Sequence, residues 1–187
     1  MRRREALQRV AVILGGTVIG AEVFLSGCKT EEKKTSMTFT QEDIPYLDEI
    51  AETIIPTTDT PGAKAAEVGK FMTVYVTDCY KEEDQKAFHE GIGKNNENAD
   101  KKFKKEFMKL SAQEKHDLLV ELDKEQKEYQ KTKKKEDPQH YFRMMKELTM
   151  LGYFTSKIGA TQALRYQETP GHYEGCIPYT KGEKAWA

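Results

Sequence analysis

Three cysteines and four histidines are the side chains of this sequence best suited to nucleophilic, acid–base or metal chemistry. None of the histidines has a nucleophile or a carboxylate at the spacing of a catalytic motif. The cysteines form no CxxC pair, and no CxxCH motif is present to attach a c-type haem. The sequence therefore predicts no catalytic, cofactor or metal site on this chain. The histidines are His89, His116, His140 and His172.

Cys28 has a different chemical role. It ends the sequence Leu25-Ser26-Gly27-Cys28, which resembles the bacterial lipobox. In that motif small residues precede a cleavage point, and the cysteine thiol is acylated and becomes the first residue of the mature chain. The alternative is a buried or disulfide-bonded Cys28. We expect the acylated form, followed by a solvated tether over residues 28–38.

Residues 1–27 have the features of an export signal. Residues 1–9 contain four arginines and one glutamate, and an apolar stretch follows over residues 10–25. That stretch is too short and too rich in glycine for a comfortable membrane-spanning helix. The pair Arg3 and Arg4 resembles the start of a twin-arginine signal. We therefore expect an exported, membrane-anchored lipoprotein, in the periplasm or on the outer cell surface.

The composition fits an exported globular domain. The chain has 30 Lys and Arg residues against 31 Asp and Glu residues, which gives a formal net charge of −1. This balance lacks the basic excess of nucleic-acid-binding proteins, so no nucleic acid is expected as a partner. Residues 39–187 have a length suited to one domain with one core.

Cys79 and Cys176 are expected to form a disulfide after export, because an oxidising compartment favours pairing of the two remaining cysteines. Two alternatives stay open. The thiols could be buried separately, or they could belong to a metal pair, which the lack of CxxC or His-rich spacing disfavours. Helical spacing places Cys79 on the inward face of its helix.

Helical periodicity dominates the sequence after the tether, and no strand-like alternation occurs. Capping boxes at Thr40–Asp43 and Ser111–Glu114 mark two helix starts, and Pro56 ends the first helix. The last helix has apolar residues on more than one face and is expected to be the central one. The prediction is an all-α, single-domain bundle of about five helices with an irregular C-terminal segment. The helices are expected over residues 44–55, 65–80, 88–110, 111–129 and 138–153.

Residues 152–179 differ from the rest in being rich in Gly, Pro and Tyr. They are too aromatic for a disordered tail. An ordered irregular segment without its own core must lie on the bundle or on a partner protein. Exposed Tyr and Trp suit interfaces, because one end of the side chain is apolar and the other forms hydrogen bonds. For Trp186 both packing on the bundle and contact with a partner are open.

Two long stretches of the sequence resemble a known family. IIPTTDTPGAKAAEVGKFMTVYVTDCY (54–80) and LTMLGYFTSKIGATQALRYQETPGHYEGC (148–176) are similar to the two diagnostic blocks of the gluconate 2-dehydrogenase subunit 3 family. Residues 107–123 between them match the linking helix pattern. The resemblance spans roughly residues 39–179, which is most of the chain after the signal.

The resemblance implies an accessory role. In that family the small subunit holds no cofactor, and it assists the folding, export and stability of a large flavoprotein. The large subunit belongs to the glucose-methanol-choline class, carries FAD and oxidises a sugar or sugar acid. A multihaem cytochrome c subunit often carries electrons onward. A lipid anchor at Cys28 would take over the anchoring role of that cytochrome, which leaves its presence open.

By matching position, the resemblance assigns two sets of residues to contact with the large subunit. The alternative is that their glycines and prolines only shape turns and their aromatics only fill the core. The first set is Asp59, Thr60, Pro61 and Gly62, and the second is Gly152, Tyr153, Phe154, Arg165, Tyr166, Pro170 and Gly171.

A second function stays open beside the accessory subunit. It is a stand-alone helical envelope lipoprotein that binds a protein or glycan without any redox partner. An independent enzyme has the least support, because no set of residues suggests one.

Overall fold

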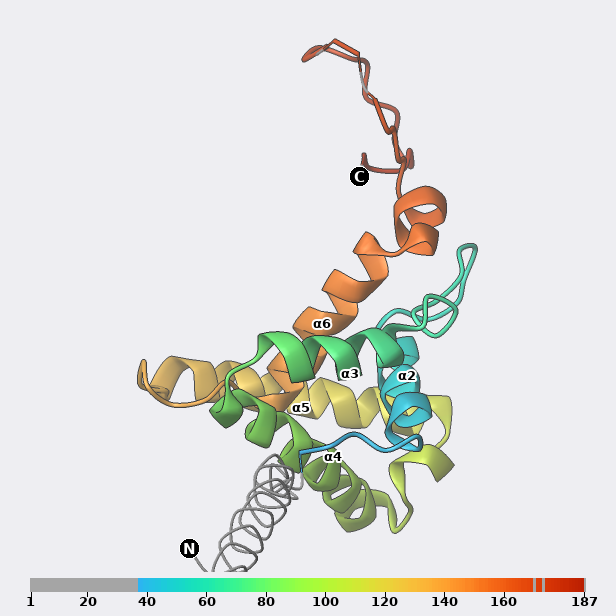
Figure 1. Ribbon diagram of the computed structural model, residues 1–187. Helices are drawn as coiled ribbons and strands as arrows, with labels where there is room; N and C mark the ends of the chain where they lie inside the picture. The colour runs from blue at the N-terminus through green and yellow to red at the C-terminus, as the bar shows by residue number, and fades with distance from the viewer. Residues whose placement is uncertain (1–36, 170, 173, 187) are drawn as a thin grey trace, which may run out of the picture. The chain divides into compact units, whose positions relative to one another are not determined.

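A computed structural model describes residues 37–169, 171–172 and 174–186, and the fold lies in the unit from Phe39 to Ala187. The described part contains five α-helices, a 3₁₀ helix, a π-helical turn and no strand, which confirms the predicted all-α class. The α-helices, labelled in Figure 1, are α2 (Asp43–Ile54), α3 (Val68–Cys79), α4 (Glu82–Phe103), α5 (Ala112–Thr132) and α6 (Tyr141–Thr155). The 3₁₀ helix η1 (Phe107–Lys109) follows α4, and the π-helical turn η2 (Gly159–Ala163) follows α6.

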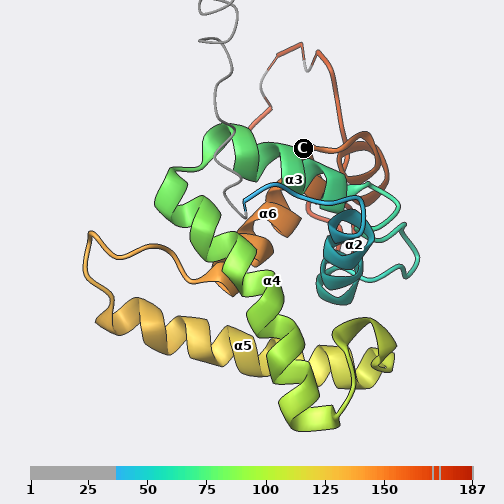
Figure 2. The ribbon, with the colours of Figure 1, turned by 60° about the horizontal axis from the view of Figure 1, so that its bottom comes forward.

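Helix α6 is the central element, as its two apolar faces predict. It packs against each of α2, α3, α4 and α5, which surround it in Figure 2. Eight of its 15 residues are buried, among them Phe142, Met145 and Leu148. A helix with neighbours on several sides buries apolar residues around most of its circumference. The hydrophobic core therefore forms around α6.

The two predicted capping boxes have different outcomes. At α5 the Ser111 hydroxyl accepts a hydrogen bond from the Glu114 amide, and the Glu114 carboxylate accepts one from the Ser111 amide. This box is complete, and its prediction is confirmed. At α2 the Asp43 carboxylate accepts from the Thr40 amide, at 2.6 Å, and also from the Thr40 hydroxyl. The Asp43 amide donates to the Thr40 carbonyl instead of the hydroxyl, so only half of that box forms.

The predicted helix over residues 88–110 is wrong at its C-terminal end. Helix α4 stops at Phe103, and Lys104 adopts a left-handed conformation, with φ 56°, that ends the helix. The chain then turns, and η1 brings Phe107 back into the core. Helical spacing thus identified buried side chains correctly, although two different elements carry them.

The helix predicted over residues 65–80 starts later than its apolar spacing suggests. Residues 63–67 form turns, and α3 begins at Val68. Glu67 has a left-handed φ of 52°, which is incompatible with a continuous helix through this residue. Helix α2 ends at Ile54, two residues before Pro56, as predicted. No helix in the described part of the chain is long and apolar enough to cross a membrane.

Gly91 and Gly93 of α4 give a matched test of the packing between α4 and α6. A Cβ atom at Gly91 would overlap Cβ and Cγ of Tyr141, whereas one at Gly93 would have no neighbour within 4 Å. We predict that Gly91→Ala lowers the free energy of unfolding by about 1–3 kcal/mol through overpacking. Gly93→Ala should raise it by about 0.5–1 kcal/mol, because alanine favours the helix. Urea denaturation followed by circular dichroism would measure the free energy of unfolding of both variants. Equal effects of the two substitutions would contradict the close contact between Gly91 and Tyr141.

Candidate partner interface

The two sets of predicted interface residues meet at one hydrogen bond. The Tyr153 hydroxyl donates to the Pro61 carbonyl oxygen at 2.6 Å, across 92 residues of sequence. The Tyr153 side chain is buried, and its ring packs edge-on against Phe154 with centroids 5.2 Å apart. The loop between α2 and α3 is therefore fixed to the C-terminal end of α6.

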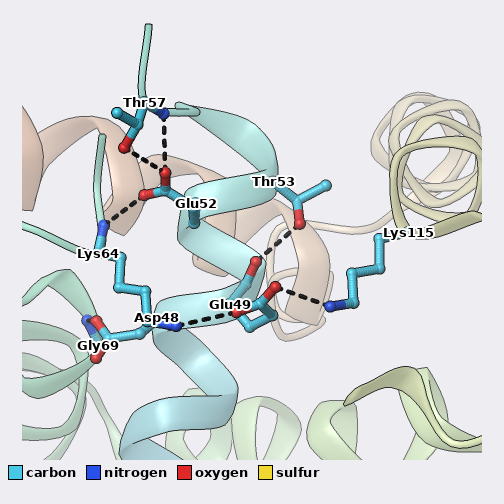
Figure 3. Close-up of polar contacts among 8 residues, drawn as sticks. All are labelled: Asp48, Glu49, Glu52, Thr53, Thr57, Lys64, Gly69 and Lys115. Carbon is cyan, nitrogen blue, oxygen red and sulfur yellow. Dashed lines mark hydrogen bonds and ion pairs between the residues drawn. The ribbon is translucent and has the colours of Figure 1, made fainter. Parts of the chain in front are cut away.

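The Glu52 carboxylate organises the loop that carries the first set. One of its oxygens accepts hydrogen bonds from the Thr57 amide, at 2.8 Å, and from the Thr57 hydroxyl, at 2.7 Å. The other oxygen accepts from the Lys64 amide at 2.9 Å. Figure 3 shows these contacts converging on Glu52 at the end of α2. A single side chain thus holds both ends of the loop.

Gly62 completes this arrangement. Its amide donates to the Thr57 hydroxyl at 3.0 Å, and a Cβ atom at this position would overlap the Glu52 carboxylate. Only glycine leaves room for that carboxylate without movement. Asp59 is exposed, whereas Thr60 and Pro61 are partly buried. Of the first set, Asp59 is thus the most accessible to a partner.

Two further acidic residues of α2 hold neighbouring elements. The Asp48 carboxylate accepts from the Gly69 amide in the first turn of α3, at 2.7 Å. Glu49 binds the ammonium of Lys115 on α5, at 2.8 Å, and that of Lys64, at 3.3 Å. Lys115 is 7% exposed and the Glu49 side chain is 24% exposed, so this ion pair is partly buried. Figure 3 shows the three carboxylates along α2.

The three carboxylates differ in electrostatics. Burial raises the pKa of the Glu52 carboxyl, but its hydrogen bonds from Thr57 and Lys64 outweigh burial and hold that pKa below its ordinary value. The hydrogen bond from Lys115 is the main reason why the pKa of Glu49 is lowered. Burial raises the pKa of Asp48 above its ordinary value, and the Gly69 amide only partly opposes this. Glu49 and Glu52 therefore remain ionised well below neutral pH.

Close packing fixes the start of the second set. A Cβ atom at Gly152 would lie 2.6 Å from a ring carbon of Phe71, so α3 and α6 approach closely at this glycine. The Ser156 hydroxyl then ends α6 by donating to the Tyr153 carbonyl and accepting from the Gly159 amide. Gly152 and Tyr153 are buried, and Phe154 is partly buried. The Tyr153 ring fills the core as the alternative expects, whereas Gly152 lies within α6 and permits close packing there instead of shaping a turn.

The remaining residues of the second set lie elsewhere. Arg165 donates its amide to the Ala185 carbonyl at 2.8 Å, and its guanidinium lies 4.1 Å from the centre of the Trp186 ring. Tyr166 and Gly171 are exposed, and Gly171 has a φ of 72°. Pro170 lies outside the described residues. The structure thus joins the first set to Tyr153 but not to Arg165, Tyr166 or Gly171.

The segment after η2 does not lie on the helices. Every described residue from Tyr166 to Trp186 is exposed, whereas Gly152, Tyr153 and Gly159 are buried. The predicted irregular segment, residues 152–179, therefore packs on its own bundle at its start but not after Arg165. The Arg165 contacts close the segment at its base, with Glu183 3.5 Å from the guanidinium. Trp186 is 52% exposed and stacks on Arg165.

The cysteines differ from their prediction. Cys79 and Cys176 are both free and exposed, and the expected disulfide is absent from this structure. Cys79 is the last residue of α3, and the buried face of that helix ends at Val76. The prediction that Cys79 faces inward is therefore wrong. Arg3, Arg4 and Cys28 lie outside the described residues.

Sequence reasoning missed Asp48, Glu49, Glu52 and Lys115. A weak signal existed, because four acidic residues, Asp43, Asp48, Glu49 and Glu52, recur along a helix that also carries a buried apolar face. Their partners lie up to 66 residues away in sequence, and no local pattern identifies them. No group of three His, Cys, Asp or Glu side chains suited to a metal ion occurs within the ranges that the structure describes. The carboxylates of α2 bind backbone amides and lysine side chains of neighbouring elements. They therefore fix the shape of the surface around α2.

Comparison with known proteins adds one finding. A family model described as gluconate 2-dehydrogenase subunit 3 matches residues 41–171, well over half of the chain. This range includes α2 to η2 and both sets of interface residues. No curated protein and no solved structure matches the chain.

Glu52 can be tested by a change that keeps its size. We predict that Glu52→Gln lowers the free energy of unfolding by about 1–3 kcal/mol at neutral pH, because an amide cannot accept all three hydrogen bonds. The folded-state pKa of Glu52 is lowered, so its contribution is complete above the ordinary glutamate pKa, about 4.3. It is lost as the pH falls through the folded-state pKa. The difference in Tm between the two proteins should therefore narrow in acid.

The matched control is Glu97→Gln on α4, whose carboxylate makes an exposed ion pair with Lys101. This change should alter the free energy of unfolding by less than about 0.5 kcal/mol. Equal stabilities of the Glu52 and Glu97 variants would contradict the role of Glu52 in holding the loop. So would a Tm difference between the wild type and Glu52→Gln that widens in acid.

Proposed function

The chain belongs to the gluconate 2-dehydrogenase subunit 3 family, as its sequence predicts, and on this premise we propose that it is the non-catalytic small subunit of a membrane-associated, flavin-dependent dehydrogenase. Its partner is a large flavoprotein of the glucose-methanol-choline class, which carries FAD and oxidises a sugar or sugar acid. This chain assists the folding, export and stability of that partner.

One observation carries the proposal. The family match covers residues 41–171, and within that range the Tyr153–Pro61 hydrogen bond joins the two diagnostic blocks into one structure. Tyr153 is itself buried, so this bond fixes the position of the loop, and the exposed Asp59 is the member of the first set that a partner reaches most easily. The fixed loop beside α6 is therefore the surface on which the large subunit docks.

The polar groups at this surface support an accessory role. Glu52 binds the backbone of its own loop, and Asp48 binds the backbone of α3. Glu49 is occupied by two lysines. A general acid or base needs a titratable group within reach of a substrate, and these carboxylates instead position the chain. The arrangement supplies a rigid docking surface for a partner that performs the chemistry.

Residues 1–36 complete the proposal, although they lie outside the described part of the chain. Arg3 and Arg4 belong to a twin-arginine-type signal that exports the folded, flavin-loaded partner together with this chain. Acylated Cys28 then anchors the complex to the membrane. A cytochrome c subunit is not required for anchoring in this arrangement.

The proposed partnership can be tested by purification of the tagged chain from its native membrane in mild detergent. We expect flavin absorbance, a larger co-purifying subunit and reduction of a dye when sugars or sugar acids are added. An unrelated tagged lipoprotein from the same membrane is the control and should carry no flavin. A colourless, lone helical protein would contradict the proposal and favour the stand-alone lipoprotein.

The anchor can be tested by Cys28→Ala. Without the thiol, no lipid can be attached, so the chain should leave the membrane fraction or accumulate with its signal uncleaved. Fractionation with and without detergent, together with the mass of the N-terminal peptide, measures this. A mature variant that still needs detergent for extraction would show that Cys28 is not the anchor.

A further inference from the structure

Helices α2, α5 and α6 enclose a groove with an apolar floor and a basic rim. The hollow is about 360 Å³ in volume, and its floor includes Ile54, Leu119 and Phe142. Lys124, Lys127 and Lys146 line its rim. A second hollow of about 350 Å³, with Arg143 and Met150 in its wall, shares Lys146 with the first. The two hollows together are called the basic groove below.

The basic groove has more cations than its own acids neutralise. The Asp123 carboxylate binds two ammonium groups, those of Lys127 and Lys146, each at 2.6 Å. Arg143 is paired with Glu147 at 2.8 Å. Lys124 has no ion-pair partner among the described residues. The rim therefore keeps a positive excess from Lys124 and from the second lysine at Asp123.

Asp123 is ionised throughout the ordinary pH range. Burial raises the pKa of its carboxyl, but the hydrogen bonds from Lys127 and Lys146 outweigh burial and lower that pKa to about 2. The carboxylate thus keeps the two ammonium groups beside the apolar floor, although the Lys127 and Lys146 side chains are 62% and 43% exposed. A guest carboxylate would find these cations already in place, which lowers the cost of ordering them.

The apolar part of the groove is accessible. Val120 of α5 is 39% exposed and Met150 of α6 is 45% exposed. Val120 lines the first hollow and Met150 lines the second, so each hollow has an exposed apolar side chain beside its cations. A ligand that matches both the apolar floor and the basic rim combines apolar side chains with carboxylates.

The groove adjoins the candidate partner interface at the end of α2. Thr53 and Ile54 line the first hollow and directly precede the loop that Glu52 holds. A protein that docks on that loop therefore lies next to the first hollow.

We propose that the basic groove binds an acidic, amphipathic segment of the dehydrogenase partner. This inference rests on the proposed function and adds a second contact to it. The apolar side of the segment covers the floor between α5 and α6, and its carboxylates pair with Lys124 and with the lysines at Asp123. Complementary charge of this kind favours the correct partner and speeds its association.

The test uses the full tagged chain, purified from native membranes in mild detergent, with bound flavin per chain as the first measurement. Lys124→Glu places a carboxylate at the rim without breaking any ion pair of the described chain. We expect it to lower flavin per chain about tenfold, because like charges at an interface are strongly unfavourable. Added salt should weaken the wild-type association as well.

Lys131→Glu is the matched control. Lys131 lies on the same helix, is exposed, pairs only with Glu128 and does not line the groove. It makes the same change in net charge and should leave flavin per chain unchanged. Circular dichroism of both variants checks that each is folded.

A photo-crosslinking residue in place of Val120 provides the second measurement. The expected product is a peptide of the large subunit that contains several Asp or Glu residues beside apolar ones. Crosslinks to lipid, to a second copy of this chain, or to a peptide without acidic residues would overturn the proposal. Normal flavin content in Lys124→Glu would overturn it too.

The two proposals fail in different ways. Suppose that the unmodified chain carries flavin, that Lys124→Glu leaves flavin per chain unchanged, and that the residue at position 120 forms no crosslink to the large subunit. The groove proposal is then wrong, and the accessory role stands. If the unmodified chain carries no flavin and no large subunit, the accessory role is wrong and the groove proposal falls with it.

Discussion

The candidate interface depends on the Glu52 carboxylate. The loop after α2 is rich in threonine, proline and glycine, and such a sequence has many accessible conformations when nothing holds it. Glu52 accepts hydrogen bonds from Thr57 and Lys64, so it fixes the loop at both ends. Hydrogen bonds to an ionised acceptor are among the stronger ones in proteins. Only a fixed loop can present the Pro61 carbonyl to Tyr153, and that contact joins the two diagnostic blocks.

The same helix ties the loop to the rest of the bundle. Asp48 holds the start of α3, and Glu49 holds Lys115 of α5. A buried ion pair often contributes little net stability, because removing two charges from water costs nearly as much as their attraction returns. Such a pair does penalise any arrangement that separates its members. We interpret Glu49 and Lys115 as setting how α5 lies against α2, which also shapes the wall of the basic groove.

The sequence could predict the helices and most of the core, because spacing reports burial directly. Phe107 is buried although the helix predicted to contain it ends at Phe103. The break itself had no signal, since Lys104 adopts a left-handed conformation that usually calls for glycine or asparagine. The role of Glu52 could not be predicted from the sequence either. Its contact with Lys64 spans 12 residues and depends on the conformation of a turn, which helical periodicity does not describe. Turn-forming residues after Pro56 predict the loop and the family resemblance assigns it to the interface, but neither identifies Glu52 as the side chain that holds it.

The C-terminal segment gives the strongest reason to expect a partner. An ordered irregular segment without its own core must pack on something, and here the described residues between Tyr166 and Trp186 are all exposed. Arg165 contacts Ala185 and Trp186, so the two ends of the segment lie together. The described residues between them remain exposed to solvent. Tyr179, at 86% exposure, offers a large amphipathic side chain to water. The family match ends at residue 171, so the contacts of Arg165 with Ala185 and Trp186 join the matched range to residues beyond it.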